Sequence, residues 1–329
     1  MRTLVTGGAG FIGSHLVERL LAACHEVVVL DDLSTGRLDN LTSVKNNSLL
    51  KIRKINITDP KIDLDNYFKG VDFVFHLAAR ADVVPSIEKP FEYHNVNVNG
   101  TVKVLEAARH AGVKKFIYTA SSSCYGIPES YPTNESAKID PRYPYALTKF
   151  LAEQYVLHWG KIYKLPVVSL RLFNVFGPRS RTSGTYGAVF GVFLAQKLAG
   201  KPFTVVGDGR QSRDFTYVSD TVDALVTAAQ SQLAGEIFNV GSGKPQSVNR
   251  LVGLIGGSVI YIPKRPGEPD CTWADISKIK KKLEWRPKVS FEKGVEILLQ
   301  HIDYWKKAPV WTPRSIEKST KEWFKYMSV

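Results

Sequence analysis

Three glycines near the start of the chain constrain its fold more than any other feature. Gly7, Gly10 and Gly13 follow an apolar strand pattern at residues 2–6 and open a helical pattern that continues through residue 21. Glycine at these positions lets the backbone turn tightly and approach a pyrophosphate, which then sits at the helix N-terminus. Because the motif lies between a strand and a helix, it predicts a dinucleotide-binding fold.

An acidic pair at the end of the second predicted strand indicates which dinucleotide is bound. The apolar run at residues 26–30 leads directly into Asp31 and Asp32. A carboxylate at this position accepts hydrogen bonds from the adenosine ribose hydroxyls, and it repels a 2′-phosphate. We therefore expect NAD rather than NADP.

Strand and helix patterns alternate along the first half of the chain. Further strands are predicted at 49–55, 73–79, 115–119 and 167–171, and helices at 93–111 and 145–163. This alternation favours an α/β fold, a doubly wound parallel sheet of the Rossmann type.

The pattern becomes mixed after residue 172, with a polar loop predicted at 179–185. We expect residues 1–172 to form the dinucleotide-binding domain and residues 173–305 a smaller substrate lobe, interleaved with returns to the main sheet. Residues 306–329 form a C-terminal extension of unknown role, expected to add a helix packed on the domain.

Composition limits the compartment and the partners. The cysteines, Cys24, Cys124 and Cys271, are scattered without a disulfide framework or metal-ligand spacing, so we expect no metal and a reducing, cytoplasmic setting. The first strand pattern leaves no room for a signal peptide, and no apolar run reaches the roughly 18 residues of a membrane span. The net charge of +13 is spread along the chain, which favours anionic substrates over nucleic acid or membrane.

Tyr145 and Lys149 form the most informative pair of side chains. Four residues apart on a helix, they lie on the same face, and an ammonium beside a phenol should lower the pKa of the phenol. The same spacing also occurs on solvated helix faces. Here the preceding strand delivers Ser121, Ser122 and Ser123, whose hydroxyls can relay protons. This set suits proton removal from an alcohol while a hydride leaves the same carbon.

Together these motifs resemble the extended short-chain dehydrogenase/reductase family, specifically its nucleotide-sugar epimerases, and most of all UDP-glucose and UDP-N-acetylglucosamine 4-epimerases. The resemblance covers about residues 1–305 and rests on the glycine motif, Asp31, His76-Leu-Ala-Ala79, Asn97-x-x-Gly-Thr101, Ser121-Ser-Ser-Cys-Tyr125-Gly, Tyr145-x-x-x-Lys149, Arg171-Leu-Phe-Asn174, Arg213-Asp-Phe-x-Tyr217 and Trp273-Ala-Asp275. It implies that NAD is held by Gly7, Gly10, Phe11, Ile12, Gly13, Asp31, Asp32, Asn56, Ile57, Leu77, Ala78, Ala79, Asn97, Tyr145 and Lys149.

The serine triplet separates reactions within the family. Sugar 4,6-dehydratases resemble this chain but carry a Thr-Asp-Glu or Thr-Ser-Glu triplet, and without that carboxylate the dehydratase and decarboxylase hypotheses are disfavoured. Some 3,5-epimerases use a cysteine two places before Tyr125, whereas Cys124 is one place before it. On a strand it would point to the opposite face, so we expect it to pack. The triplet is similar to that of UDP-hexose, UDP-N-acetylhexosamine and UDP-glucuronate 4-epimerases.

The resemblance implies a mechanism and a set of substrate contacts. Tyr145 takes the proton of the sugar 4-hydroxyl with Ser121 as relay, Lys149 holds the nicotinamide ribose, and NAD is recycled. The substrate is expected to be bound by Ser121, Ser122, Ser123, Asn174, Arg213, Arg265 and Thr272. At the position that bounds the sugar 2-substituent, Thr272 leaves space for an N-acetyl group where a tyrosine would exclude it.

Several points stay open in the sequence. Asn56 stands where the family often has an aspartate, and Arg80 and Asp82 either recognise a distinctive sugar or pair with each other. The alternatives are a nucleotide-sugar dehydrogenase, a UDP-glucuronate or other nucleotide-sugar epimerase, or a non-catalytic member that binds NAD or RNA. The resemblance also implies a homodimer through the helices at 93–111 and 145–163.

Overall fold

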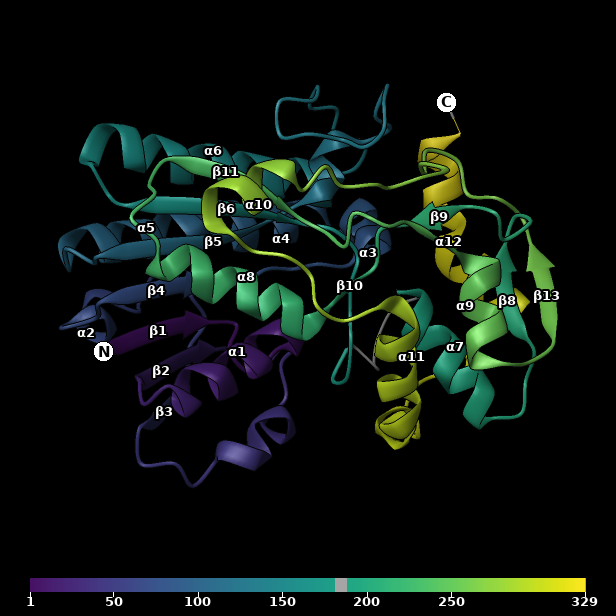
Figure 1. Ribbon diagram of the computed structural model, residues 1–329, viewed down its shortest axis with the longest axis horizontal. Coiled ribbons are helices and arrows are strands. Elements are labelled where there is room, and N and C mark those ends of the chain that lie inside the picture. The colour runs from purple at the N-terminus through teal and green to yellow at the C-terminus, as the bar shows by residue number, and fades with distance from the viewer. Residues whose placement is uncertain (181–187, 329) are drawn as a thin grey trace.

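A seven-stranded parallel sheet forms the centre of the larger lobe (Figure 1). The computed structural model describes residues 1–180 and 188–328, so the predicted loop at 179–185 lies mostly outside the described residues. From edge to edge the sheet consists of β11 (Glu236–Val240), β6 (Val167–Leu172), β5 (Lys115–Ser121), β4 (Phe73–His76), β1 (Arg2–Thr6), β2 (Glu26–Asp31) and β3 (Leu50–Lys54). Every neighbouring pair is parallel, which confirms the expected doubly wound sheet.

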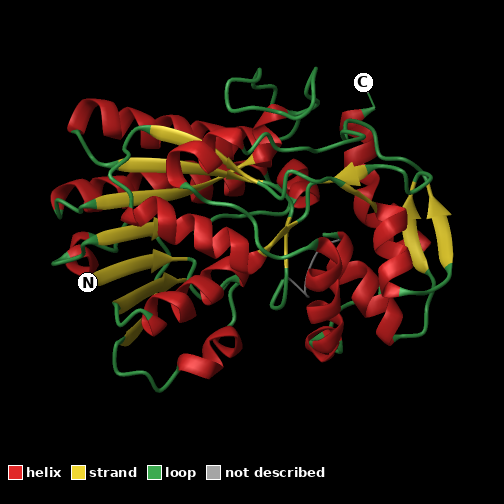
Figure 2. Ribbon diagram, viewed as in Figure 1, coloured by secondary structure: helices red, strands yellow, loops and turns green. Residues whose placement is uncertain are grey.

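Helices cover both faces of this sheet (Figure 2). One face packs against α1 (Phe11–Ala22), α8 (Val218–Gln230) and α10 (Ser277–Leu283), and the other against α2 (Asp65–Phe68), α5 (Gly100–His110) and α6 (Pro144–Tyr163). Alternate residues of β2 contribute to the two cores, with Val27 and Val29 on one side and Val28 and Leu30 on the other. Both faces of each strand are buried because helices lie on both sides.

The smaller lobe combines short strand pairs, two of them parallel and one antiparallel, with helices. β8 (Phe203–Val206) pairs with β13 (Val259–Ile262), and two-residue strands pair as β7 (Val175–Phe176) with β10 (Thr216–Tyr217) and β9 (Ser212–Arg213) with β12 (Gln246–Ser247). The helices are α7 (Val189–Leu198), α9 (Val248–Ile255), α11 (Phe291–Gln300), a 3-10 turn at Ile302–Trp305 and α12 (Pro313–Met327). Its core is rich in aromatic rings, and the rings of Phe176 and Phe190 stack 4.7 Å apart.

The structure alters some expected boundaries. The predicted helix at 145–163 is found as α6, but the predicted helix at 93–111 is divided into α4 (Pro90–His94), a π-helical turn (Asn95–Asn99) and α5. Strand β4 ends at His76, so residues 77–79 form part of the following loop. The 3-10 turns at Leu38–Val44 and Ser122–Tyr125 and the helix α3 (Val83–Glu88) lie close to the ends of the strands.

The serines and the cysteine that were expected on a strand therefore lie partly on a turn. Cys124 is buried in the core, and burial raises the pKa of its thiol to about 12. The argument from alternating strand faces was wrong, because residues 122–125 form the 3-10 turn. The thiol packs, as expected, but for this different reason.

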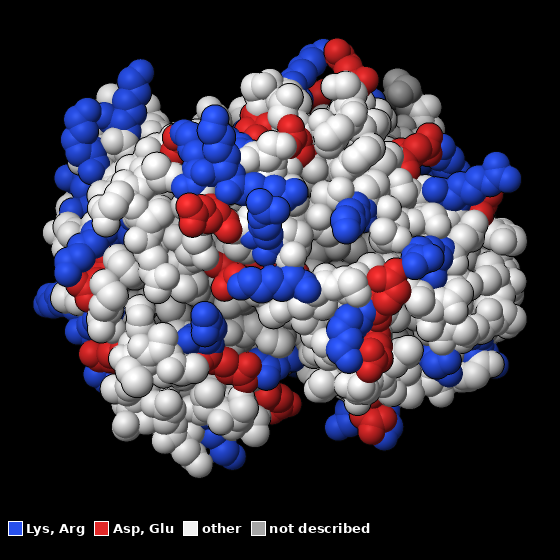
Figure 3. Space-filling model, in the orientation of Figure 1, with Lys and Arg blue, Asp and Glu red and all other residues white. Residues whose placement is uncertain are grey.

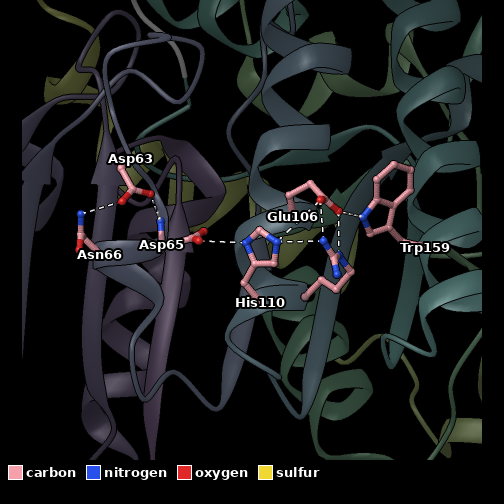
Figure 4. Close-up of polar contacts among 7 residues, drawn as sticks. Asp63, Asp65, Asn66, Glu106, His110 and Trp159 are labelled. Atoms are coloured by element: carbon pink, nitrogen blue, oxygen red, sulfur yellow. Dashed lines mark hydrogen bonds and ion pairs between the residues drawn. The ribbon is translucent and has the colours of Figure 1, made fainter.

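A polar network ties α5 to α6 and to α2 on the outside of the sheet (Figure 4). The carboxylate of Glu106 accepts hydrogen bonds from Trp159 Nε1 at 2.7 Å and from Arg109 at 2.8 Å. His110 contacts Asp65 at 2.9 Å. These contacts fix α6 against its neighbour, and α6 carries the predicted Tyr–Lys pair.

Charged side chains are mixed on the face shown in Figure 3, where acidic groups lie among the basic ones. The net charge of +13 is thus spread rather than gathered into one basic block there. Within residues 1–180 and 188–328, none of the helices combines the length and the apolar character that a membrane crossing requires.

Candidate active site

The predicted site residues gather around one cavity at the carboxyl ends of the parallel strands, between the two lobes. Its volume is about 660 Å³, and its wall includes Gly7, Asp31, Tyr143, Arg213, Arg265 and Thr272. Open α/β sheets bind ligands at this edge because the helices and loops after the strands leave a crevice there. The cavity therefore brings both predicted halves of the site, cofactor and substrate, into one space.

The glycine turn after β1 is shaped so that larger side chains cannot replace it. Gly7 has φ of +71°, and a Cβ there would lie 2.8 Å from the backbone nitrogen of Ala78. A Cβ at Gly13 would lie 2.1 Å from the carbonyl oxygen of Gly7. The turn opens α1, whose N-cap residue Gly10 offers no side-chain cap. Phe11 and Ile12 line the cavity beside it, so the N–H groups of a helix terminus face a ligand-sized space.

The carboxylate of Asp31 lies directly beneath this turn. It accepts hydrogen bonds from the backbone N–H of Ala9 at 2.9 Å and of Leu33 at 2.9 Å. Burial raises its pKa, although these backbone bonds oppose the rise. The adjacent Asp32 accepts from the N–H of Ser34 at 2.9 Å and lines the cavity. Both acids are where the sequence predicted them, and Asp31 also fixes the shape of the loop.

Five more predicted positions form the adjoining wall. Asn56, Ile57 and the loop residues Leu77, Ala78 and Ala79 all line the cavity. The carbonyl oxygen of the Asn56 side chain accepts from the N–H of Thr58 at 2.9 Å and from its hydroxyl at 2.8 Å. This oxygen is thus already engaged in a local turn, which the sequence alone did not reveal.

Asn97 is not among the residues that line the cavity, and its contact with the cofactor stays a prediction. It is buried, and its amide oxygen accepts from the N–H of Arg80 at 2.8 Å. Its amide nitrogen donates to the carbonyl of Arg80 and to the hydroxyl of Thr148, each at 3.0 Å. These bonds occupy the side chain and connect the helical turn at 95–99 to α6 and to the loop after β4. In this structure Asn97 positions the cavity wall.

His76 was quoted in the sequence only as part of a motif, yet it holds three elements together. It is fully buried, with Nδ1 2.6 Å from the hydroxyl of Thr6 and Nε2 2.8 Å from that of Thr101. The Thr101 hydroxyl donates its proton to the carbonyl of Asn97, so it accepts a hydrogen bond from Nε2–H of His76. Burial lowers the pKa of His76 to about 3.

The hydroxyl groups expected for proton transfer form a connected chain. The Ser121 hydroxyl donates to that of Ser123 at 2.9 Å, and the Tyr145 phenol hydrogen-bonds to Ser121. Ser122, Ser123 and Tyr143 line the cavity, whereas Tyr145, Ser121 and Lys149 are not part of its wall. Ser121 reaches the wall through its hydrogen bond with Ser123, and Tyr145 reaches it through the stacked ring of Tyr143.

Tyr145 and Lys149 lie on the same face of α6, but their electrostatics differ from the expectation. The ammonium of Lys149 lies over the ring of Tyr118, 4.4 Å from its centroid, and the side chain is only 4% exposed. Burial lowers the pKa of Lys149 to about 7, and the carboxylate of Glu153 opposes this change. Burial raises the pKa of Tyr145, and the bond to Ser121 only partly offsets it. The predicted lowering of the Tyr145 pKa by Lys149 is wrong, because burial is the largest influence on the phenol and raises its pKa.

Two arginines lie at the far side of the cavity and share one acidic partner. The carboxylate of Glu268 lies 3.1 Å from Arg265 and 3.8 Å from Arg213. Burial lowers the pKa of Arg213, and Glu268 opposes this effect. The sequence predicted both arginines but missed Glu268 as their common partner, although Glu268 stands only three residues after Arg265.

Asn174 and Thr272 are joined, which the sequence could not show because 98 positions separate them. The Thr272 hydroxyl donates to the amide oxygen of Asn174 at 2.8 Å and accepts from the N–H of Asp214 at 3.0 Å. Both side chains line the cavity. The small Thr272 side chain is therefore held firmly at the wall.

Comparisons with known proteins agree with this geometry. The chain is 41% identical over 303 residues to a UDP-glucose 4-epimerase from Mycolicibacterium smegmatis, covering 90% of this chain and 96% of that protein. A solved UDP-N-acetylglucosamine 4-epimerase from Methanobrevibacter ruminantium M1 superimposes with a TM-score of 0.87 and 36% identity, covering 92% of this chain and 98% of that one. A UDP-glucuronic acid 4-epimerase from Bacillus cereus, solved with UDP-glucuronic acid and NAD, superimposes with a TM-score of 0.86 and 34% identity. The match covers 92% of this chain and 99% of that one.

The family model for NAD dependent epimerases and dehydratases matches residues 3–241. That match confirms both the expected family resemblance and the expectation of NAD as the cofactor. The chain belongs to the NAD dependent epimerase/dehydratase family.

Proposed function

We propose that this protein is a UDP-sugar 4-epimerase that interconverts UDP-glucose with UDP-galactose and UDP-N-acetylglucosamine with UDP-N-acetylgalactosamine. One observation carries the proposal. A single cavity has the glycine turn at one side and the Arg213–Arg265 pair at the other, and the hydroxyl chain from Ser123 to Tyr145 opens onto it. Such an arrangement suits an anionic nucleotide sugar whose reacting hydroxyl faces a base.

The residues around the glycine turn fit NAD. The turn leaves space where a Cβ at Gly7 would collide with Ala78, and the N-terminus of α1 beside it suits a pyrophosphate. Asp31 and Asp32 lie where an adenosine ribose would be held. When bound, NAD supplies the hydride acceptor for the sugar carbon and a positive charge that favours a nearby phenolate.

Tyr145 serves as the base that takes the proton of the sugar 4-hydroxyl. Burial raises the pKa of its phenol, and the hydrogen bond with Ser121 opposes this rise. Ser121 and Ser123 extend the hydroxyl chain to the wall of the cavity, which gives the proton a route. The ammonium of Lys149 lies one helical turn from Tyr145 against the ring of Tyr118, and the carboxylate of Glu153 helps to keep it charged.

Arg213 and Arg265 anchor the diphosphate. A guanidinium fork matches two phosphate oxygens, and both guanidinium groups lie beside the same carboxylate, that of Glu268. Asn174 contributes an amide that Thr272 already holds in place. Because Thr272 is small, the wall beside the sugar 2-position leaves space for an N-acetyl group, and this supports the wider substrate range.

The proposal is tested by incubating the NAD-loaded protein with UDP-glucose, UDP-N-acetylglucosamine and UDP-glucuronate while the anomeric proton signals are followed by NMR. New signals of the 4-epimers from the first two substrates are expected. Tyr145→Phe should abolish them while leaving UDP binding intact. Absence of any epimer from all three nucleotide sugars contradicts the proposal.

A UDP-glucuronate epimerase is the second candidate, and Arg80 is the residue that supports it. Arg80 lines the cavity, but its guanidinium pairs with Glu92 at 2.9 Å. Because Glu92 already compensates the charge of Arg80, the uronate stays the second choice. A nucleotide-sugar dehydrogenase would instead release NADH together with a keto-sugar.

We also propose that the protein is a homodimer that pairs α5 and α6 of each copy. Large apolar side chains remain exposed on and beside these helices, including Leu147 at 45%, Tyr155 at 41% and Phe91 at 80%. A four-helix arrangement about a twofold axis would bury them. Light scattering on the purified protein tests this, and Leu147→Glu should shift the mass toward the monomer.

A further inference from the structure

The C-terminal helix α12 is remote in sequence from every predicted site residue, yet it lies against the cavity. It begins with a capping box, in which Thr312 and Ser315 bond reciprocally, and it buries one stripe formed by Ile316, Thr320 and Trp323. It packs beside α3, which belongs to the other lobe (Figure 1). The helix lies beyond residue 241, where the match to the family model ends.

Trp323 fixes the loop that carries the arginine–glutamate pair. Its indole Nε1 donates to the carbonyl of Pro266 at 2.9 Å, and the side chain is only 1% exposed. One turn further on, Met327 lies so close to the loop that a Cβ at Gly267 would be 2.7 Å from its terminal methyl. The loop between Arg265 and Glu268 is thus held from the outside by α12.

Trp323 also reaches the proposed catalytic region through one intermediate ring. Its ring lies 5.6 Å from that of Tyr143, and the ring of Tyr143 stacks parallel to that of Tyr145 at 6.5 Å. The Tyr143 phenol hydrogen-bonds to Ser123. Trp323 and Tyr143 both line the cavity, so the pair forms a continuous aromatic surface that ends at the proposed base.

The position of this surface indicates which part of a ligand it meets. Tyr143 shares the cavity wall with Arg213 and Glu268, and its ring stacks on that of Tyr145. In the proposed function the arginines hold the diphosphate and Tyr145 acts at sugar C4. The part of a nucleotide sugar that spans these two ends is the sugar itself.

We propose that Trp323, with Tyr143, forms the outer wall of the sugar subsite, so that α12 contributes a side chain to the substrate site. This inference rests on the proposed function, because it uses a nucleotide sugar as the ligand. Trp323 acts as a positioning and specificity residue: its ring limits the space beside the sugar and keeps Tyr143 stacked on Tyr145. The nucleotide half of the substrate lies away from it.

The test compares UDP with UDP-N-acetylglucosamine as probes on NAD-loaded protein, by calorimetric titration. Trp323→Ala should weaken UDP-N-acetylglucosamine about tenfold, since it removes a large ring from a packed wall, and change UDP binding by less than about threefold. Trp323→Phe keeps a ring but not the N–H, so it should bind both ligands nearly as the wild type does. Lys321→Ala, an exposed position on the same helix, is the matched control.

Two other binding results would contradict the proposal that Trp323 forms the outer wall of the sugar subsite. Equal losses for UDP and UDP-N-acetylglucosamine in Trp323→Ala mean that the residue only supports the arginine loop. A Phe variant as weak as the Ala variant assigns the effect to the hydrogen bond with Pro266. If Trp323→Ala fails to fold by circular dichroism, Trp323→Leu and Tyr143→Leu take its place with the same two probes.

Catalysis and the wall can fail separately. Wild-type protein that binds UDP-N-acetylglucosamine but epimerises no nucleotide sugar refutes the proposed function. In that case the affinities of the Trp323 variants for UDP-N-acetylglucosamine and for UDP still test whether Trp323 forms the wall of the sugar subsite. Wild-type protein that binds neither probe overturns both.

Discussion

The carboxylate of Glu153 lies 2.6 Å from the guanidinium of Arg171, and both side chains are almost completely buried. Glu153 stands one helical turn after Lys149 on α6, and Arg171 lies on β6, so this ion pair joins the helix of the proposed base to the sheet. The hydroxyl of Ser169 also donates to Glu153 at 2.7 Å, and Arg171 donates to Tyr125 at 2.9 Å. The pair is therefore part of a larger hydrogen-bonded network.

Replacing Glu153 with Gln should destabilise the protein strongly, because Arg171 would keep a buried charge without a counter-charge. A loss of about 3–5 kcal/mol is expected for one broken member of a buried pair. Urea unfolding followed by circular dichroism measures it. The double variant Glu153→Leu with Arg171→Met should lose less than Glu153→Gln alone, and a greater loss would contradict this account.

Lys149 should give the stability of the protein a distinct dependence on pH. Its folded pKa of about 7 lies below the ordinary value of 10.5, so between these values the unfolded chain binds more protons than the folded one. Stability from this group therefore increases as pH rises through that range, by up to about 1.4 kcal/mol per pH unit. Below pH 7 the cost of burying the charge is fully present.

The measurement is urea unfolding at pH 7.0, 8.0 and 9.0 for the wild type and for Lys149→Met. The variant should show a smaller increase with pH, because the other groups titrate alike in both proteins. Parallel curves would show that the buried Lys149 does not titrate in this window.

Thr272 should control the acceptance of N-acetyl sugars. A tyrosine at this position would fill the space beside the sugar 2-substituent, so Thr272→Tyr should abolish turnover of UDP-N-acetylglucosamine while UDP-glucose turnover persists. Because Thr272 also holds Asn174 through its hydroxyl, Thr272→Ser is the control that keeps this bond and the space. Equal loss of both activities in Thr272→Tyr would refute the assignment.

Glu268 should compete with the substrate for the two arginines. Glu268→Gln removes a negative charge that lies 3.1 Å from Arg265 and 3.8 Å from Arg213. The dissociation constant for UDP should fall several-fold, about 1 kcal/mol in binding, since a diphosphate no longer meets a like charge. Calorimetric titration at two salt concentrations checks this. A weaker complex would mean that Glu268 serves chiefly to orient the guanidinium groups.

Local patterns were sufficient to predict the parts of the site that lie close together in sequence. The glycine turn, Asp31 and the Tyr145–Lys149 pair each occupy a few neighbouring positions, and their geometry follows from the local strand–turn–helix order. The predicted electrostatics of the Tyr145–Lys149 pair failed because burial depends on residues remote in sequence, such as Tyr118 on β5, whose ring lies against the Lys149 ammonium. The position of Trp323 follows from contacts with Pro266 and Tyr143. Such contacts between distant parts of the chain cannot be predicted from a local sequence pattern.

Strand β11 occupies the edge of the sheet beside β6, although more than sixty positions separate the two in the chain. The dinucleotide-binding half is therefore completed only after α7, β8 and the other elements between β6 and β11 have been synthesised. A fragment cut at residue 172 would present the open backbone of β6 to solvent and to other copies. Attempts to express that half alone should end the fragment after β11 rather than at the apparent change of pattern.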